Sequence, residues 1–302
     1  MKLVSVYINA YNAEKFILET VNSVLNQTYK NLQVIVVDDA STDKTPEILA
    51  SIDDSRLEVY RVEPNGNISN ALNVGLSHIK GEYVAHDDAD DLWMPDKIEK
   101  QVEYLENNPQ CDFCVTHVGM IDENGDNADE KYTQMRDIYN ISGMSQAKMF
   151  RYFYDHANHI CHCSMLARAE LIKKVGKYDL SMLYLQDFDY WMRVLCFTPI
   201  HIIEEPLTLY RIHSGNNSRM NEAKWTSHDT EYARLMEKAI NLLPADVFCE
   251  AFADKLKIKG EHTPEEIELE KAFVMIDAVL PLLPNNHIAI KKFAELFNQE
   301  KY

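Results

Sequence analysis

The sequence predicts an α/β protein with a Rossmann-like mixed central sheet flanked by helices, followed by a C-terminal helical extension. Short segments rich in Val and Ile alternate with segments whose apolar residues recur every three or four positions, as strands and helices do when they alternate. Several of the expected strands end in polar, acid-bearing loops. Beyond residue 220 the strand pattern stops, and apolar faces at helical spacing indicate helices alone.

The first hundred residues predict repeated strand–helix units. A strand over 2–8 precedes a helix whose apolar residues, from Phe16 to Leu25, recur at helical spacing, and a buried strand over 32–37 follows. The cap and turn residues at 38–43 end that strand. The pattern then repeats, with expected helices over 45–52 and 69–79 and expected strands over 57–62 and 83–86.

Three polar loops follow three of these strands, at residues 9–12, 38–39 and 87–91. Ligands of an open parallel sheet bind outside the carboxyl ends of its strands. We therefore expect these three loops to line one crevice.

The second half of the chain has a weaker pattern. Pro95 begins an expected helix that reaches residue 105, and a further strand over 111–121 makes the expected sheet mixed. From about 142 to 219 the pattern is irregular, with short strand signals at 164–166 and 200–203 and a helix over 186–196. We expect this part to receive a second substrate.

Prolines at four positions lie near the expected boundaries of the later helices, namely Pro244, Pro264, Pro281 and Pro284. The prediction is one main domain over 1–219, divided into a donor half (1–110) and an acceptor half (111–219), with a helical extension over 220–302.

The net charge of -18, from 30 Lys and Arg against 48 Asp and Glu, argues against a nucleic-acid partner, because the chain would repel a phosphate backbone. A nucleotide remains compatible with this charge if a metal cation screens the repulsion. An acidic protein that binds a diphosphate therefore depends more strongly on a bound cation than a basic protein would.

The chain has no run of about 20 apolar residues and no signal-peptide pattern at its N-terminus, so we expect a cytoplasmic location. Its six cysteines are expected to be reduced. Cys111, Cys114 and the segment 159–163 could be drawn as a zinc site, but residues three apart in a strand point to opposite faces. Buried thiols are the preferred interpretation.

Residues 87–91 (DDADD) place four carboxylates within five positions after a strand. Their mutual repulsion favours a hard divalent cation, Mn²⁺ or Mg²⁺, because carboxylates suit both ions. An acidic turn before a helix N-terminus explains the same residues equally well, since the helix dipole favours acids there. This segment alone does not decide between the two interpretations.

The segments VSVYINAYNAEKF, VIVVDDASTDKT and ALNVGLSHIKGEYVAHDDADDLWMPDKIEKQ decide it. In this order they resemble the motifs of the family 2 glycosyltransferases, over roughly residues 3–218. The resemblance implies a GT-A fold, a nucleoside-diphosphate-sugar donor and an inverting transfer. The C-terminal helices lie outside it.

The resemblance also implies the donor-site residues. Asp88 and Asp90 would be the outer residues of the DxD motif and would bind the metal and the nucleotide sugar. Asp39 would bind the nucleobase, and Tyr11 would stack on it, with ordinary packing as the alternative for Tyr11. Asn9 and Asn73 are further polar candidates, although Asn9 departs from the Pro or Thr that many relatives carry.

In the second half, residues 185–191 (LQDFDYW) resemble the EDxDxW-like motif of these enzymes, with Gln186 in place of Glu. Asp187 is the candidate catalytic base, because a carboxylate in reach of a hydroxyl can take its proton. Capping of the helix by Asp187 or Asp189 is the alternative. Trp191 is a candidate acceptor platform, with packing beneath the base as the other interpretation.

His213 lies in a YRxHxxxxS-like segment, which implies a place near the diphosphate or the metal. The predicted enzyme is therefore a metal-dependent, inverting hexosyl- or N-acetylhexosaminyltransferase. We expect a UDP-linked donor and a glycan or lipid-linked glycan acceptor, in the synthesis of cell-surface polysaccharide, lipopolysaccharide or capsule.

Such an acceptor would draw the protein to the inner face of the membrane, and the C-terminal helices are candidates for that contact or for a homo-oligomer.

Three other functions stay open at the level of sequence. A nucleotidyltransferase could use a similar sheet, although a Gly-rich phosphate loop with a Lys is missing near the N-terminus. A polyprenyl-phosphate sugar transferase would have less need of the segment around Asp187. Leu72 stands where many relatives carry Arg. Together with the departures at Asn9 and Gln186, this would also suit a catalytically silent nucleotide-binding or scaffold protein.

Overall fold

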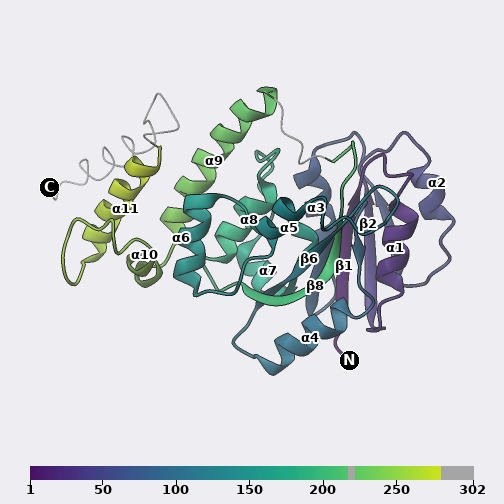
Figure 1. The fold of residues 1–302 in the computed structure, drawn as a ribbon, viewed down its shortest axis with the longest axis horizontal. Helices are drawn as coiled ribbons and strands as arrows, with labels where there is room; N and C mark the ends of the chain where they lie inside the picture. The colour runs from purple at the N-terminus through teal and green to yellow at the C-terminus, as the bar shows by residue number, and fades with distance from the viewer. Residues whose placement is uncertain (217–221, 280–302) are drawn as a thin grey trace.

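The computed structural model describes residues 1–216 and 222–279. The predicted boundary at 219/220 and the prolines at 281 and 284 lie outside these residues. Figure 1 shows the central sheet on one side of the molecule and the C-terminal helices gathered at the other end. None of the helices in the described part is both long and apolar enough to span a bilayer.

Eight strands form a single mixed sheet in the order β3-β2-β1-β4-β7-β6-β8-β5. The first four of these neighbours run parallel, whereas β7 is antiparallel to both β4 and β6. The strands are β1 Val4–Ala10, β2 Leu32–Asp38, β3 Leu57–Arg61, β4 Tyr83–Asp88, β5 Leu92–Trp93, β6 Phe113–Ile121, β7 Leu166–Arg168 and β8 His201–Arg211. The predicted mixed α/β sheet is confirmed.

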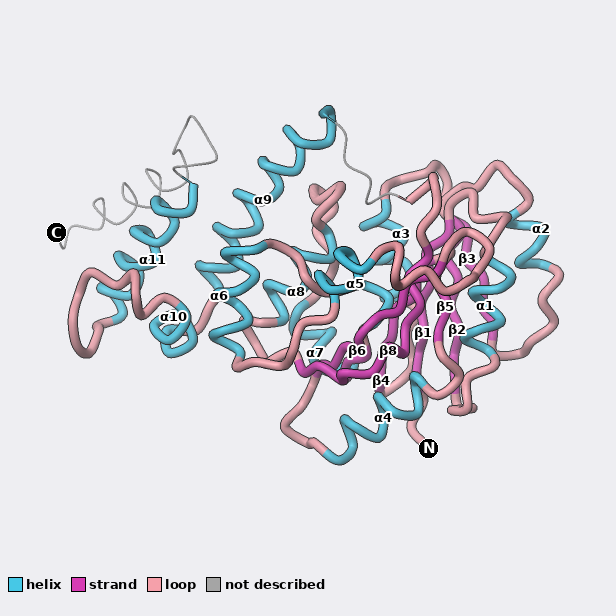
Figure 2. Tube along the Cα trace, in the orientation of Figure 1, coloured by secondary structure: helices cyan, strands magenta, loops and turns pink. Residues whose placement is uncertain are grey.

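Helices flank the sheet and continue after it (Figure 2). They are α1 Ile17–Leu25, α2 Thr45–Ala50, α3 Ile68–Ser77, α4 Lys97–Asn107, α5 Thr133–Tyr139, α6 Gln146–His156, α7 Ala169–Val175, α8 Gln186–Val194, α9 Glu222–Leu242, α10 Ala245–Ala251 and α11 Pro264–Val279, with a 3₁₀ turn at His162–Ser164.

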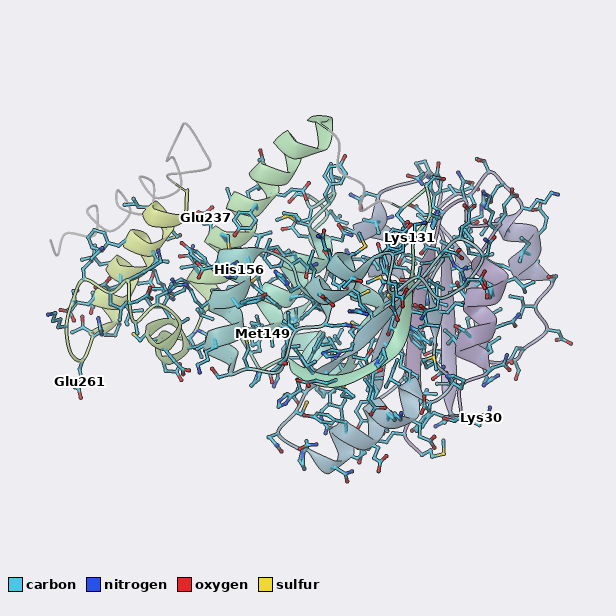
Figure 3. All side chains as sticks on the ribbon, in the orientation of Figure 1. Lys30, Lys131, Met149, His156, Glu237 and Glu261 are labelled. Carbon is cyan, nitrogen blue, oxygen red and sulfur yellow. The ribbon has the colours of Figure 1, made fainter. Side chains whose placement is uncertain are left out.

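Alternate side chains of the central strands fill two different cores. In β2, Ile35 and Val37 belong to one core, and Val34 and Val36 to the other, because successive strand residues point to opposite faces. The first core includes residues of α3 and α6–α11, and the second includes residues of α1 and α4. Figure 3 draws the side chains on the ribbon and labels Met149 of α6, which belongs to the first core.

The expectation of an irregular segment from 142 to 219 is wrong in part. It contains α6 and α7, and α6 buries Met149, Phe150 and Phe153 on one face. Its aromatic residues have only moderate helix propensity, and packing of the buried face supplies the rest of the stabilisation. Strand β8 is longer than the expected 200–203, because it continues through Pro206 past register shifts on both sides of His117.

Candidate active site

The carboxyl ends of β1, β2 and β4 lie side by side at one edge of the sheet. Ala10 is paired with Asp38, and Asn9 with Asp88, in the register of the strands. The three polar loops expected to meet there are therefore neighbours. Asn9 Oδ1 is buried and has no hydrogen-bond partner among the described residues, so it can accept a hydrogen bond from a ligand at this edge.

The loops after β1 and β2 are tied together around Tyr11. Asn12 has a left-handed backbone, with φ of 49°, and its Oδ1 accepts a hydrogen bond from Thr42 N at 2.8 Å. Its own backbone N donates to Ser41 Oγ at 2.9 Å. Tyr11 itself stays 55% exposed. A fixed loop thus presents an accessible aromatic ring, as base stacking requires.

Asp39 follows β2 directly and is hydrogen-bonded to Ala10, the residue before Tyr11. Its backbone N donates to Ala10 O at 2.8 Å, and its Oδ1 accepts a hydrogen bond from Gly66 N at 3.1 Å. Burial raises the pKa of the Asp39 carboxyl. The neighbouring Asp38 is paired with Arg61. The edge therefore holds one neutralised acid, Asp38, and one acid held only by a backbone amide, Asp39.

The four carboxylates of 87–91 are not a single cluster. Asp87 and Asp91 are buried, whereas Asp88 and Asp90 are partly exposed. Asp91 accepts hydrogen bonds from Arg211 N and Cys163 Sγ, both at 2.7 Å. Burial raises the pKa of both Asp87 and Asp91. Asp91 is thus held by structural contacts, whereas both oxygens of the buried Asp87 have no hydrogen-bond partner among the described residues. The two outer DxD residues lie at the edge of the sheet.

Asp90 meets His213 across the edge. Asp90 Oδ2 and His213 Nε2 are 2.8 Å apart, and the histidine ring packs against Phe16. At this distance the two groups are hydrogen-bonded to each other, and a carboxylate oxygen and an imidazole nitrogen are both ligand types of divalent cations. These residues fit the metal that the DxD motif implies.

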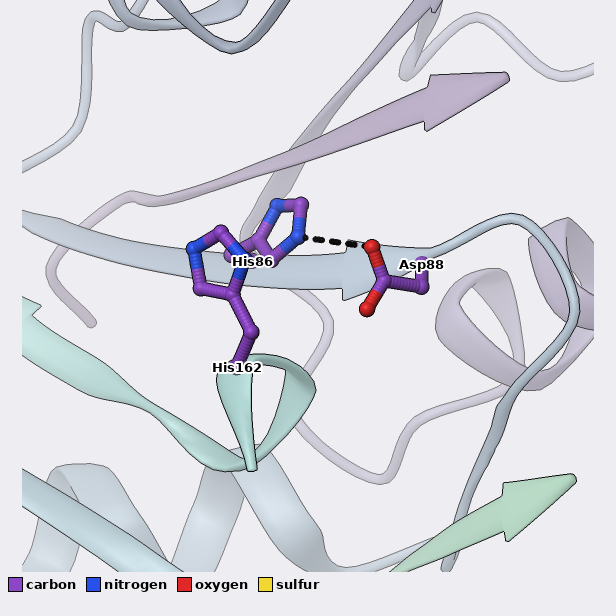
Figure 4. Close-up of side chains that lie close together, drawn as sticks. All are labelled: His86, Asp88 and His162. Carbon is purple, nitrogen blue, oxygen red and sulfur yellow. Dashed lines mark hydrogen bonds and ion pairs between the residues drawn. The ribbon is translucent and has the colours of Figure 1, made fainter. Parts of the chain in front are cut away.

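Sequence reasoning missed two histidines next to Asp88. His86 Nε2 lies 3.2 Å from Asp88 Oδ1, and the His86 and His162 rings are 3.8 Å apart between centroids (Figure 4). Burial lowers the pKa of His86 to about 3 and that of His162 well below its ordinary value. His86 precedes the DxD motif by two positions, and this strand period of two was the available signal.

Asp187 lies at the start of α8. Its Oδ2 accepts a hydrogen bond from Asn158 Nδ2 at 2.8 Å, and its Oδ1 accepts one from Phe188 N at 2.7 Å. Burial, with a contribution from the charge of Asp88, raises the pKa of Asp187 to about 6. A carboxyl with this pKa can act as a base near neutral pH.

Two predicted contact residues are instead part of the framework. Trp191 is fully buried, with its ring against His162 and Phe113, so the prediction of an acceptor platform is wrong and the packing alternative holds. The Asn73 amide donates to Tyr178 O and accepts from Tyr178 N, at 2.9 and 2.8 Å. Both of its polar atoms thus hold the segment before α8.

The C-terminal helix α9 supports the same segment, which the sequence did not reveal. Glu231 Oε2 accepts hydrogen bonds from the backbone N of Tyr184 and of Leu185, at 2.9 and 3.0 Å. The N-cap residue of α8 is Leu185, without a side-chain cap hydrogen bond, so neither Asp187 nor Asp189 is the N-cap that the sequence suggested. Asp189 instead forms a buried ion pair with Arg193 at 2.7 Å.

The mixed sheet and its acidic edge define the class: an α/β protein of the GT-A glycosyltransferase fold. Comparisons with known proteins agree. The model of "Glycosyl transferase family 2" matches residues 5–176. An uncharacterized glycosyltransferase of Methanocaldococcus jannaschii is 34% identical over 236 residues, which are 76% of this chain and 78% of that protein. The chain belongs to glycosyltransferase family 2.

Further relatives have named activities or ligands. The Escherichia coli enzyme WfaP, a UDP-Glc:alpha-D-GlcNAc-diphosphoundecaprenol beta-1,3-glucosyltransferase, is 29% identical over 234 residues, 72% of this chain and 80% of WfaP. The structure of S. aureus TarS 1-349 with UDP has a TM-score of 0.65 at 19% identity, over 100% of this chain and 93% of that one. A Pyrobaculum calidifontis mannosyltransferase with GDP-Man and Mn²⁺ has a TM-score of 0.58 at 18% identity, over 98% and 74%.

Proposed function

We propose that this protein transfers a hexosyl or N-acetylhexosaminyl group from a UDP-linked sugar to a hydroxyl of a glycan or lipid-linked glycan, with inversion. The family membership supports the transfer. The named activity of WfaP, with a UDP-sugar donor and a lipid-diphosphate-linked acceptor, supports both substrate classes. The UDP-GlcNAc complex of TarS is consistent with the same donor class.

In this proposal the edge of the sheet holds the donor. Tyr11 stacks on the base, Asp39 accepts a hydrogen bond from it, and Asn9 Oδ1 offers a further acceptor. Asp88 contacts the ribose side of the nucleotide. Asp90 and His213 hold Mn²⁺ or Mg²⁺, which supplies positive charge to the departing diphosphate.

Asp187 is the proposed catalytic base, and the observation that carries the proposal is its position and pKa. Its carboxyl lies close enough to Asp88 to be affected by that charge, and its pKa is about 6. It would remove the proton of the acceptor hydroxyl as the hydroxyl oxygen bonds to the anomeric carbon. The bond between that carbon and the diphosphate oxygen breaks at the same time, which inverts the configuration.

A lipid-linked acceptor would place the protein at the cytoplasmic face of a membrane, in the synthesis of a surface polysaccharide. The exposed faces of α9–α11 are the proposed contact for the membrane or for a second copy of the chain. The alternative, a catalytically silent nucleotide binder, is favoured by Gln186 and Asn9, which replace family residues.

A donor screen tests the proposal. The full chain is incubated with UDP- and GDP-linked sugars, in Mn²⁺ or in EDTA, and released nucleoside diphosphate is measured. We expect release from at least one UDP-sugar in Mn²⁺ and its loss in EDTA. Proton NMR of the product then reports the anomeric configuration. Binding of UDP without release from any donor would favour the silent binder.

A further inference from the structure

Two imidazoles and a carboxylate meet at the end of β4, outside the Asp90–His213 pair. One ligand atom from each of His86, Asp88 and His162 lies within 4.8 Å of the other two. The two histidines come from different parts of the chain, β4 and the 3₁₀ turn before β7, and their rings lie beside each other (Figure 4). The fold therefore brings two histidines that the family motif does not account for next to Asp88 of the DxD motif.

The hydrogen bonding of His86 aims a lone pair at Asp88. His86 Nδ1 lies 3.1 Å from Tyr7 O, and a carbonyl oxygen only accepts, so Nδ1 carries the ring hydrogen. In the neutral ring, Nε2 is then an acceptor that faces Asp88 Oδ1 at 3.2 Å. Two acceptors at this distance need either a proton between them or a cation beside them. An imidazole held by a backbone carbonyl through its other nitrogen is the usual state of a metal ligand.

His162 is oriented in the same manner. Its Nε2 lies 2.8 Å from Tyr178 OH, which lies 2.7 Å from Tyr7 OH, and all three side chains are buried. This chain of hydrogen bonds holds the ring through Nε2. When Nε2 donates its hydrogen to Tyr178 OH, Nδ1 has a free lone pair for a ligand. A cation about 2.1 Å from each donor needs donors roughly 3.4 Å apart. Small side-chain shifts within the 4.8 Å limit would close the set.

Access to this cluster is from one side. His86 is fully buried and His162 is 7% exposed, whereas the Asp88 side chain is 28% exposed. An ion held here would keep open positions on the side of Asp88, toward the proposed donor. Three protein ligands with an open position are the arrangement of catalytic rather than structural metal sites. Two imidazoles with one carboxylate suit a first-row transition metal better than Mg²⁺.

A neighbouring cluster, Asp91 with Cys161 and Cys163, is the weaker candidate. Its carboxylate already accepts hydrogen bonds from Arg211 N and Cys163 Sγ, so both oxygens are in use. It is fully buried, with no partly exposed member through which an ion would enter.

From these contacts we infer that His86, Asp88 and His162 form a second divalent transition-metal site, separate from Asp90 and His213. The inference goes beyond the proposed transfer and does not depend on it. Asp88 connects the second metal site with the proposed donor site, because the Asp88 carboxylate would bind this ion and also lie beside the nucleotide.

Cobalt binding tests the inference on the full chain, without any nucleotide sugar. The double variant Asp90→Asn/His213→Ala removes the other metal-binding pair, and the protein is freed of metal with a chelator. We expect this variant to bind one Co²⁺ per chain. X-ray absorption should show two imidazole nitrogens and oxygen ligands, with no sulfur. Sulfur ligands would instead assign the ion to Cys161 and Cys163, and absence of Co²⁺ binding would overturn the inference.

Histidine variants in the same background give a second measurement. His86→Phe and His162→Phe should each weaken Co²⁺ binding by about tenfold or more. His156→Phe, on the exposed side of α6, is the matched control and should leave it unchanged. Equal affinity in all three variants would overturn the inference. Circular dichroism checks that His86→Phe and His162→Phe are folded. If one of them is not folded, the X-ray absorption result on the double variant still tests the inference.

Discussion

The edge formed by β1, β2 and β4 and the segment around α8 are built in different ways. At the edge, each polar side chain lies at the end of its own strand or a few residues after it, and the parallel register brings Asn9 and Asp88 together. Around α8, Asp187 is positioned by residues from elsewhere in the chain, with Asn158 on its carboxylate and Glu231 on the backbone before it. The proposed donor edge is thus set by local topology, and the proposed base by tertiary contacts.

The largest expected effect separates chemistry from binding. Asp187→Asn should lower kcat by about 10²- to 10⁴-fold, because it removes the base but keeps the shape of the side chain and its contact with Phe188 N. The KM for the donor should stay within a factor of about two to three, since Asp187 does not belong to the donor edge.

Steady-state kinetics measure both values. Asp137→Asn, on the exposed helix α5, is the control for loss of a carboxylate. Retained turnover in Asp187→Asn would assign the base elsewhere.

The next effect tests the donor edge. Asp90→Asn should lower kcat/KM by about 10²- to 10³-fold, because a neutral amide holds the ion and its charge less well. The midpoint of a Mn²⁺ activation curve should shift to higher concentration. A variant that keeps both the wild-type rate and the wild-type Mn²⁺ curve would exclude Asp90 as a ligand.

Much of this edge was predictable from sequence. The strand ends and the loops that follow them depend on local patterns, so the bounds of β1–β4 were predicted to within about two residues. The assignment of Asp88 and Asp90 to a DxD motif came from the family resemblance and stays a prediction. His86, His162 and Glu231 were missed, because their significance depends on partners far away in the chain. Trp191 was misassigned for the same reason, since periodicity gives its helical face and not whether that face is covered.

Tyr11 should have a smaller effect, confined to binding. Tyr11→Ala should raise the KM for the donor by roughly 5- to 150-fold, the equivalent of about 1 to 3 kcal/mol of base stacking. Tyr11→Phe keeps the ring and should stay near the wild-type KM. A drop in kcat at unchanged KM in Tyr11→Ala would point to a role other than stacking.

The pH dependence should show the smallest effect. The pKa of Asp187 is raised to about 6 by burial, and the ionised form is the active base, so kcat should rise with pH through about 6 and level off above it. At pH 5 it should be about a tenth of the plateau. A profile of kcat from pH 4.5 to 8 measures this, and an unchanged rate at pH 5 would contradict the assignment.

The central claim is that the donor edge and the base at α8 are separate parts of one site. Calorimetric titration of UDP in Mn²⁺ into wild-type protein, Asp90→Asn and Asp187→Asn tests it most directly. We predict a UDP Kd within about threefold of wild type for Asp187→Asn and at least about tenfold weaker for Asp90→Asn. Equal weakening in both variants, or wild-type affinity in Asp90→Asn, would contradict the claim.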